Sequence, residues 1–201
     1  FIKIYANSTF DLSANRPYLK WSVEETFLIS PTDFPDIAGY VPPPCFVVQN
    51  ADPQRVNLLD LSTVSAPSVN GLLVGSRVID WTFLERHYFT VYQSSLTKGA
   101  YQYWTKVNVL ANQVGSIFDT PPATITGNII NVNDSSENIV GFFQATNQSY
   151  SRFFLLSSDL PFPLLVEKCD FDGSYNPSDY PQRCFNCENL LNSSFDRPSW
   201  F

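Results

Sequence analysis

Methionine is absent from this chain of 201 residues, including position 1, and histidine occurs once, as His87. A single histidine excludes most metal centres built from several imidazoles, and it makes a Ser-His-Asp triad depend on one residue in a strand-like segment. We therefore interpret His87 as a structural residue. The missing initiator methionine indicates a processed or partial chain.

Positive charge is also scarce. The chain has 12 Lys and Arg against 19 Asp and Glu, a formal net charge of -7, and its basic residues form no run. Phosphate backbones are bound by clustered cations, so nucleic acid is excluded as the main partner. The eight glycines form neither of the common phosphate-binding patterns, GxGxxG or GxxxxGK[ST]. We expect no cofactor.

Long apolar runs are missing as well. The longest, such as residues 153–156, are far shorter than the roughly 20 residues that a membrane-spanning helix needs. What the chain does have is 44% hydrophobic residues, 15 prolines, 17 phenylalanines and 10 tyrosines. That composition predicts a loop-rich, mainly β protein with an aromatic core.

Alternating apolar residues predict several strands. The clearest is residues 18–29, where Leu19, Trp21 and Val23 share one parity. Residues 31–44 hold five prolines and a glycine and predict a break. Further strands are expected at residues 45–49, 55–60, 72–81, 86–93, 124–132, 139–145 and 152–156.

One helix is expected, at about residues 97–114. Its apolar stripe runs through Ala100, Trp104, Val107, Ala111 and Val114 at helical spacing, so that face should pack on the sheet. We predict a mainly β fold of Ig-like, β-sandwich-type sheets with this amphipathic helix. Residues 1–160 would form the β-rich domain, and residues 161–201 an irregular cysteine-bearing tail packed on it.

The four cysteines are Cys45, Cys169, Cys184 and Cys187. An even number, with three in the tail, favours two disulfides in an oxidising compartment. The alternatives are a zinc site, which needs a second closely spaced pair, and a redox C-x-x-C, which lacks a thioredoxin-like context. We predict a stapled tail in which Cys45 and Cys169 each pair with one cysteine of the C-x-x-C motif.

Paired carboxylates are the remaining candidates for chemistry. Glu24 and Glu25 are adjacent on a strand and must point to opposite faces, which excludes them as a catalytic pair. The side chains of Asp170, Asp172 and Asn176 resemble the start of a calcium loop but lack its closing glutamate, so an ordinary Asx-rich turn is favoured over a metal site. No catalytic residues are predicted.

Several stretches taken together resemble the domain of unknown function 4249 family, over most of residues 18–201. They are YQSSLTKGAYQYW at residues 92–104, GSIFDTPPA at 115–123, GNI at 127–129, VGFFQA at 140–145, Arg152 with its apolar run, CFNC at 184–187 and RPSW at 197–200. The resemblance implies a secreted lipoprotein of the Bacteroidetes outer membrane, frequently encoded beside TonB-dependent receptors. It also implies a lipidated cysteine and a β-sandwich region upstream of residue 1.

On that resemblance we expect a non-enzymatic lipoprotein, lipid-anchored at the cell-surface or periplasmic face of the outer membrane. Its partner would be an outer-membrane β-barrel protein, with a TonB-dependent receptor as the first choice. The alternative is a carbohydrate- or peptide-binding surface module that uses exposed aromatic rings as stacking platforms. A carboxylate-dependent hydrolase is the third reading, and nothing in the sequence fixes an acid and a base for it.

Overall fold

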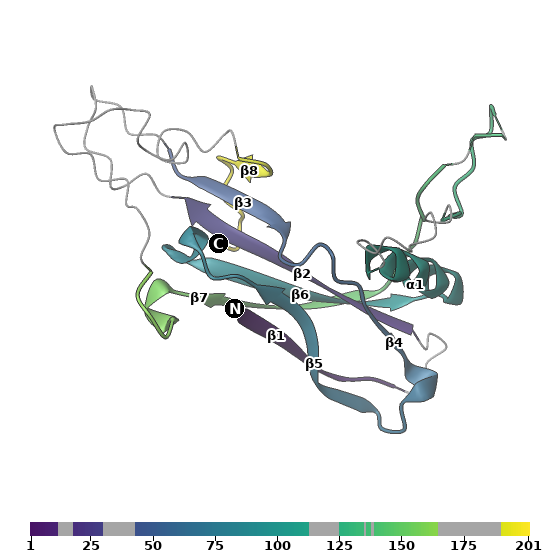
Figure 1. The fold of residues 1–201 in the computed structure, drawn as a ribbon, viewed down its shortest axis with the longest axis horizontal. Coiled ribbons are helices and arrows are strands. Elements are labelled where there is room, and N and C mark those ends of the chain that lie inside the picture. Colours follow the sequence, from purple (N-terminus) through teal and green to yellow (C-terminus); the bar gives the residue numbers. More distant parts are fainter. Residues whose placement is uncertain (12–17, 30–42, 113–124, 135, 138, 165–189) are drawn as a thin grey trace, which may run out of the picture.

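The computed structural model describes residues 1–11, 18–29, 43–112, 125–134, 136–137, 139–164 and 190–201. Figure 1 shows two layers of strands with one helix at the end of the larger layer. The elements are β1 (Ile2–Thr9), β2 (Tyr18–Ile29), β3 (Cys45–Asn50), β4 (Asn57–Asp60), β5 (Ser68–Arg77), β6 (His87–Leu96), α1 (Lys98–Asn112), β7 (Gln148–Leu155) and β8 (Ser193–Ser194), with short 3-10 helices at Leu61–Thr63, Trp81–Phe83 and Ser157–Asp159.

The strands form two antiparallel sheets. β1 pairs with β5, and the six-stranded sheet has the order β7-β6-β2-β3-β8, with β4 also beside β2. One edge of the long strand β2 pairs with β6, while its other edge is shared by β4 at residues 18–21 and β3 at residues 24–29. Between these two partners, the Ala51 amide donates to the Val23 carbonyl at 2.9 Å. β2 is therefore the central strand of the fold.

The core lies between the two sheets. The odd-numbered residues of β2, including Leu19, Trp21 and Val23, point towards the smaller sheet and pack with its Ile4 and Val74. We call this the inner face of the six-stranded sheet. A Cβ added at Gly75 of β5 would lie 3.1 Å from a methyl carbon of Val23, so a glycine permits this close approach. The architecture confirms a mainly β fold and is consistent with a β-sandwich.

The helix α1 confirms the expected element within two residues at each end. Its first half packs on the outer face of the sheet: Ala100 is fully buried, Tyr101 stacks on Tyr18 at 4.5 Å, and the Lys20 ammonium lies 3.4 Å from the centre of the Trp104 ring. Further along the predicted stripe, Ala111 is exposed. The apolar stripe in the sequence is thus longer than the part of the helix that packs on the sheet.

The two strands expected at residues 124–132 and 139–145 are wrong, because the described residues of these ranges form no strand. They lie beside each other without a backbone ladder. Instead, the Asn128 side chain donates to the Phe143 carbonyl at 2.8 Å and accepts from the Phe143 amide at 2.7 Å. β-branched residues favour a strand only where a neighbouring strand completes the pairing, and here a side chain takes that place.

In the last described segment, residues 190–201, β8 forms the edge of the six-stranded sheet and the chain then turns onto the outer face. β8 pairs with β3, and the rings of Trp200 and Phe201 lie 5.2 and 4.8 Å from that of Tyr88. Cys45, at the start of β3, is buried and disulfide-bonded. The tail cysteines, Cys169, Cys184 and Cys187, lie outside the described residues, so stapling of the tail remains a prediction.

Candidate functional site

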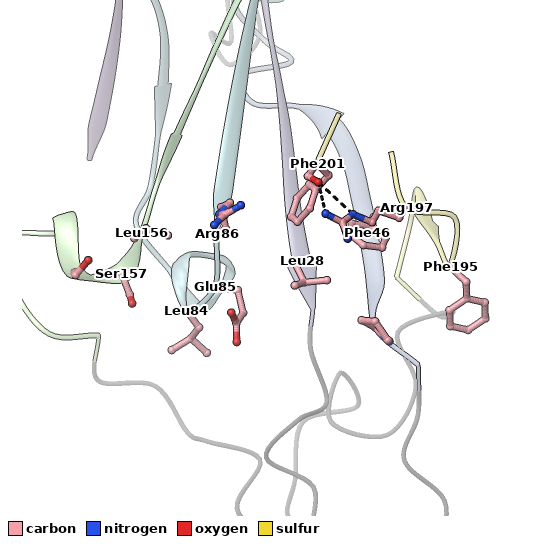
Figure 2. A pocket seen from close by; sticks show the side chains of 12 residues that line it. Leu28, Phe46, Leu84, Glu85, Arg86, Leu156, Ser157, Phe195, Arg197 and Phe201 are labelled. Carbon is pink, nitrogen blue, oxygen red and sulfur yellow. Dashed lines mark hydrogen bonds between the residues drawn. The ribbon is translucent and has the colours of Figure 1, made fainter. Parts of the chain in front are cut away.

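A pocket of about 690 Å³ opens where the outer face of the six-stranded sheet ends (Figure 2). We call it the aromatic pocket. Five separate stretches of the sequence form it: the end of β2, the start of β3, the turn before β6, the turn after β7, and the segment after β8. Its lining residues are Leu28, Pro44, Phe46, Leu84, Glu85, Arg86, Leu156, Ser157, Ser158, Phe195, Arg197 and Phe201.

Strand register and the final turn of the chain position the pocket's apolar wall. Leu28 of β2 is the register partner of Phe46 of β3, which places both side chains on the same face. The Phe201 ring packs edge-on against Phe46 at 4.9 Å. The Arg197 guanidinium donates to the Phe201 carbonyl through Nε at 3.1 Å and through Nη2 (Figure 2). Arg197 thus holds the chain folded back over the sheet.

Two arginines give the pocket its positive charge. The Arg86 guanidinium lies 5.0 Å from the centre of the Phe154 ring, and its Nη1 donates to the Tyr88 hydroxyl at 3.3 Å. Within the described part of the chain, neither Arg86 nor Arg197 forms an ion pair. Guanidinium donors beside phenyl and leucine surfaces suit a ligand with an apolar or sugar-ring face and acceptor oxygens.

A second groove of about 400 Å³ lies between β1 and β7, at the open side of the sandwich. Its floor includes Trp21 and Gln93: the Gln93 side-chain oxygen accepts from Ser8 Oγ at 2.5 Å and from Trp21 Nε1 at 3.1 Å. Tyr5 and Phe153 also line it. The polar groups on its floor are already bonded to one another, so this groove offers fewer free donors than the aromatic pocket.

The inner face contains a group of ionisable and polar residues that we call the buried cluster: Glu25, Arg77, Asp80, Thr82 and His87. One oxygen of Glu25 accepts from Arg77 Nε at 2.7 Å and lies 3.1 Å from His87 Nε2, and its other oxygen accepts from the Gln49 amide at 2.6 Å. Glu25 and His87 are 1% and 0% exposed. No ligand can reach Glu25 or His87 in this conformation, which favours a structural role for these two residues, whereas Arg77 and Asp80 are partly exposed.

The buried cluster contains further hydrogen bonds, made by His87 and by Asp80. His87 Nδ1 lies 3.2 Å from the Thr82 carbonyl, so both ring nitrogens face acceptors and a neutral ring can donate to only one of them. Asp80 accepts from Arg77 Nη1 at 2.9 Å and from the Thr82 hydroxyl at 2.6 Å. Two carboxylates thus face one guanidinium and one imidazole.

These contacts shift the acidities of the carboxyl groups. Burial by itself raises the pKa of Glu25, but hydrogen bonds from His87 and Gln49 and the charges of Arg77 and His87 bring that pKa below its usual value. Burial also raises the pKa of Asp80, and bonds from Thr82 and Arg77 outweigh that effect and lower it. Both groups are therefore ionised at neutral pH.

The structure separates Glu24 from Glu25 as the alternation of a strand predicts. Glu25 enters the buried cluster, whereas Glu24 accepts from the Tyr92 hydroxyl at 3.2 Å on the outer face. The interpretation of His87 as structural fits its place in the cluster.

The calcium candidates Asp170, Asp172 and Asn176 lie outside the described residues. In the portions of the chain that the structure describes, no three metal-ligating side chains gather.

Sequence reasoning missed the residues that give the aromatic pocket its character, above all Arg86, Phe195 and Arg197. Each lies in a turn or coil, and only Arg197 belongs to a motif that the sequence analysis singled out. The one available signal was the resemblance of residues 197–200 to a family motif, and it did not indicate a pocket. The pocket exists only because the last segment folds over the sheet.

A family model described as "Domain of unknown function (DUF4249)" matches residues 5–152 of the chain. The chain belongs to this family. The match begins in β1 and ends in β7, so it covers α1, every strand except β8 and the last residues of β7, and six of the twelve residues that line the aromatic pocket. It does not extend to residues 190–201, which close the pocket.

Comparison with curated proteins and with solved structures finds no match to this chain. Across the described ranges, no helix combines the length and the apolar character that crossing a membrane requires.

Proposed function

We propose that this protein is a non-enzymatic surface lipoprotein of an outer membrane, where it serves as an accessory subunit of a TonB-dependent transporter or another β-barrel complex. It is anchored by a lipid on sequence upstream of residue 1, and it contributes a binding surface rather than a reaction. Family membership motivates the location and the partner. The aromatic pocket is the observation that supports a binding role.

The lining of the aromatic pocket favours binding over catalysis. Glu85 is the one carboxylate among its described lining residues, and these include neither histidine nor cysteine. Hydrolysis of a glycosidic bond commonly requires two carboxyl groups, and general acid-base chemistry requires a group within reach of the proton that it moves. Leucine and phenylalanine surfaces with two arginines provide contact area and hydrogen-bond donors instead.

The test is extraction of the full-length lipoprotein from its native membrane in mild detergent, followed by mass spectrometry of the proteins that stay bound. We expect a β-barrel protein in stoichiometric amount. A lipoprotein that remains solitary at several detergent and salt conditions contradicts the proposal. A soluble protein as the sole stoichiometric partner also contradicts it.

Direct binding of a carbohydrate or a peptide is the second candidate, and Phe195 favours it. This ring lines the aromatic pocket and is 45% exposed, which suits a stacking platform. A screen of oligosaccharides and peptides by calorimetry would identify a ligand. Phe195→Ala should then weaken binding by about tenfold, since a stacked ring contributes on the order of 1 kcal/mol or more.

Phe162 provides the matched control for Phe195. It is 49% exposed but is not among the residues that line the aromatic pocket. Phe162→Ala should leave the affinity unchanged. Equal losses from both substitutions would place the ligand elsewhere.

We also propose that disulfides staple the tail, residues 161–201, to the β-rich domain of residues 1–160. The buried and disulfide-bonded Cys45 supports this pairing from the side of the domain. Peptide mapping under non-reducing conditions, after alkylation of free thiols, should join the Cys45 peptide to a peptide from the C-x-x-C motif. Alkylated Cys184 and Cys187 would contradict it.

A further inference from the structure

The segment between α1 and β7 projects away from both sheets (Figure 1). We call residues 125–147 the arm; residues 135 and 138 within it are not described. Its described residues run outward, turn where the Glu137 amide donates to the Asp134 carbonyl at 3.2 Å, and return to the start of β7. Of the elements described, it is the one that lies outside the two-sheet body.

The base of the arm is fixed to the body. The Phe142 ring lies 5.1 Å from the Tyr103 ring of α1, and the Gln144 side-chain oxygen accepts from Trp104 Nε1 at 3.0 Å. Its two limbs also touch directly: a Cβ added at Gly127 would lie 1.4 Å from the Gly141 carbonyl oxygen. The arm therefore has a defined shape, and its outer part is presented at a fixed place on the molecule.

Both limbs of the arm expose large apolar side chains. Ile130 is 78% exposed, Val132 86%, Val140 71% and Phe143 74%. Isolated exposed apolar residues are normal on any protein, but four of them on one short projecting segment favour an interaction surface. The body does not cover these side chains.

The charges of the arm restrict what can cover it. Residues 125–147 contain no Lys, Arg or His, whereas Asp134 and Glu137 lie at the turn. The Asp134 side chain accepts from the amide and the hydroxyl of Ser136, at 2.9 and 2.6 Å, which directs the turn. An anionic lipid surface would repel such an arm, since peripheral membrane segments use Lys and Arg.

We propose that the arm docks this lipoprotein onto its protein partner, inserting Ile130, Val132, Val140 and Phe143 into an apolar groove that is flanked by Lys or Arg residues facing Asp134 and Glu137. The inference rests on the proposed function, because it assigns the surface through which the accessory subunit holds its partner. The partner's chemistry follows from the arm: an apolar floor with a basic rim.

Site-specific photo-crosslinking in native membranes tests the contact. The full-length lipoprotein carries p-benzoylphenylalanine in place of Val132 or of Phe143, with Tyr5 of β1 as the control position, since Tyr5 is also exposed. We expect one discrete adduct from both arm positions and none from Tyr5, with a crosslinked partner peptide that contains Lys or Arg beside apolar residues. Adducts to lipid, to another segment of this chain or to a second copy overturn the proposal, as does the absence of an adduct.

A second experiment tests the charges and separates this inference from the proposed function. Val132→Ser with Phe143→Ser should reduce the partner retained in detergent extraction by about tenfold, as truncation of central interface residues does. Asp134→Asn with Glu137→Gln should reduce it less and remove part of its salt dependence. Thermal unfolding of each variant should match that of the unsubstituted protein.

The outcomes distinguish the two proposals. If the unsubstituted protein retains a β-barrel and the arm variants retain it equally well, the arm proposal fails and the proposed function stands. If the unsubstituted protein retains a soluble partner that is lost from the arm variants, the arm proposal stands and the outer-membrane role fails.

Discussion

The buried cluster and the arm place polar and apolar groups in opposite ways. In the cluster, ionisable groups such as Glu25 and His87 lie in the core, and each has hydrogen-bonding partners. On the arm, apolar groups such as Val132 lie in solvent without cover. Burying charge is costly unless it is paired, and exposing an apolar cluster is unusual unless a partner covers it. The buried cluster is therefore expected to stabilise the fold, whereas the arm is expected to bind a partner.

The largest effect should come from removing the central charge of the buried cluster. Glu25→Gln keeps the size of the side chain but leaves Arg77 and His87 without their shared carboxylate, so we expect a loss of about 3–5 kcal/mol in the free energy of unfolding. Urea denaturation measures it. Glu24→Gln on the outer face is the matched control and should cost less than about 0.5 kcal/mol. Equal losses would contradict a special role for the buried cluster.

The pH dependence of the unfolding free energy should depend on the same buried cluster. The pKa values of Glu25 and Asp80 are lower in the folded protein than in the unfolded chain, so their stabilising contribution is full above the unfolded values of about 4 and is lost as the pH falls through the folded ones. Unfolding free energy should decline below about pH 4. In Glu25→Gln that decline should be shallower, and an unchanged slope would contradict this assignment.

A smaller effect of opposite sign is expected at Thr26. Its hydroxyl is buried and is the one described buried side-chain polar atom without a hydrogen-bonding partner. Thr26→Val removes this unsatisfied group at nearly constant shape and should stabilise the protein by about 1 kcal/mol. Thermal unfolding tests this expectation, and a lower melting temperature would indicate that the hydroxyl has an undetected partner, such as water.

The smallest global effect is expected on the arm. Asn128→Ala removes both bonds to the Phe143 backbone, yet the arm contributes little to the core, so unfolding free energy should change by less than about 0.5 kcal/mol. Amide exchange at Phe143 should nevertheless become faster. If exchange stays slow, contacts at the base alone define the arm.

Local sequence patterns predicted the elements in which the spacing of apolar residues matches the buried face. Alternation of Leu19, Trp21 and Val23 predicted β2 and its buried face, and the helical stripe predicted α1. The same alternation predicted that Glu24 and Glu25 would separate. Pattern and propensity failed on the arm, where the two segments expected as strands lie side by side but form no backbone ladder in the described residues. Propensity describes the single residue, whereas a strand needs a partner.

What the sequence by itself determined is the mainly β class, the strand at residues 18–29, the helix and membership of the family. What only the tertiary structure decided is which distant residues meet. Arg77 and His87 reach Glu25 from two different strands, and Arg86 meets Phe201 in one pocket only because the chain turns back across the outer face. Periodic burial is a local property that a sequence displays directly. Convergence of isolated residues depends on strand order and register, which long-range packing sets.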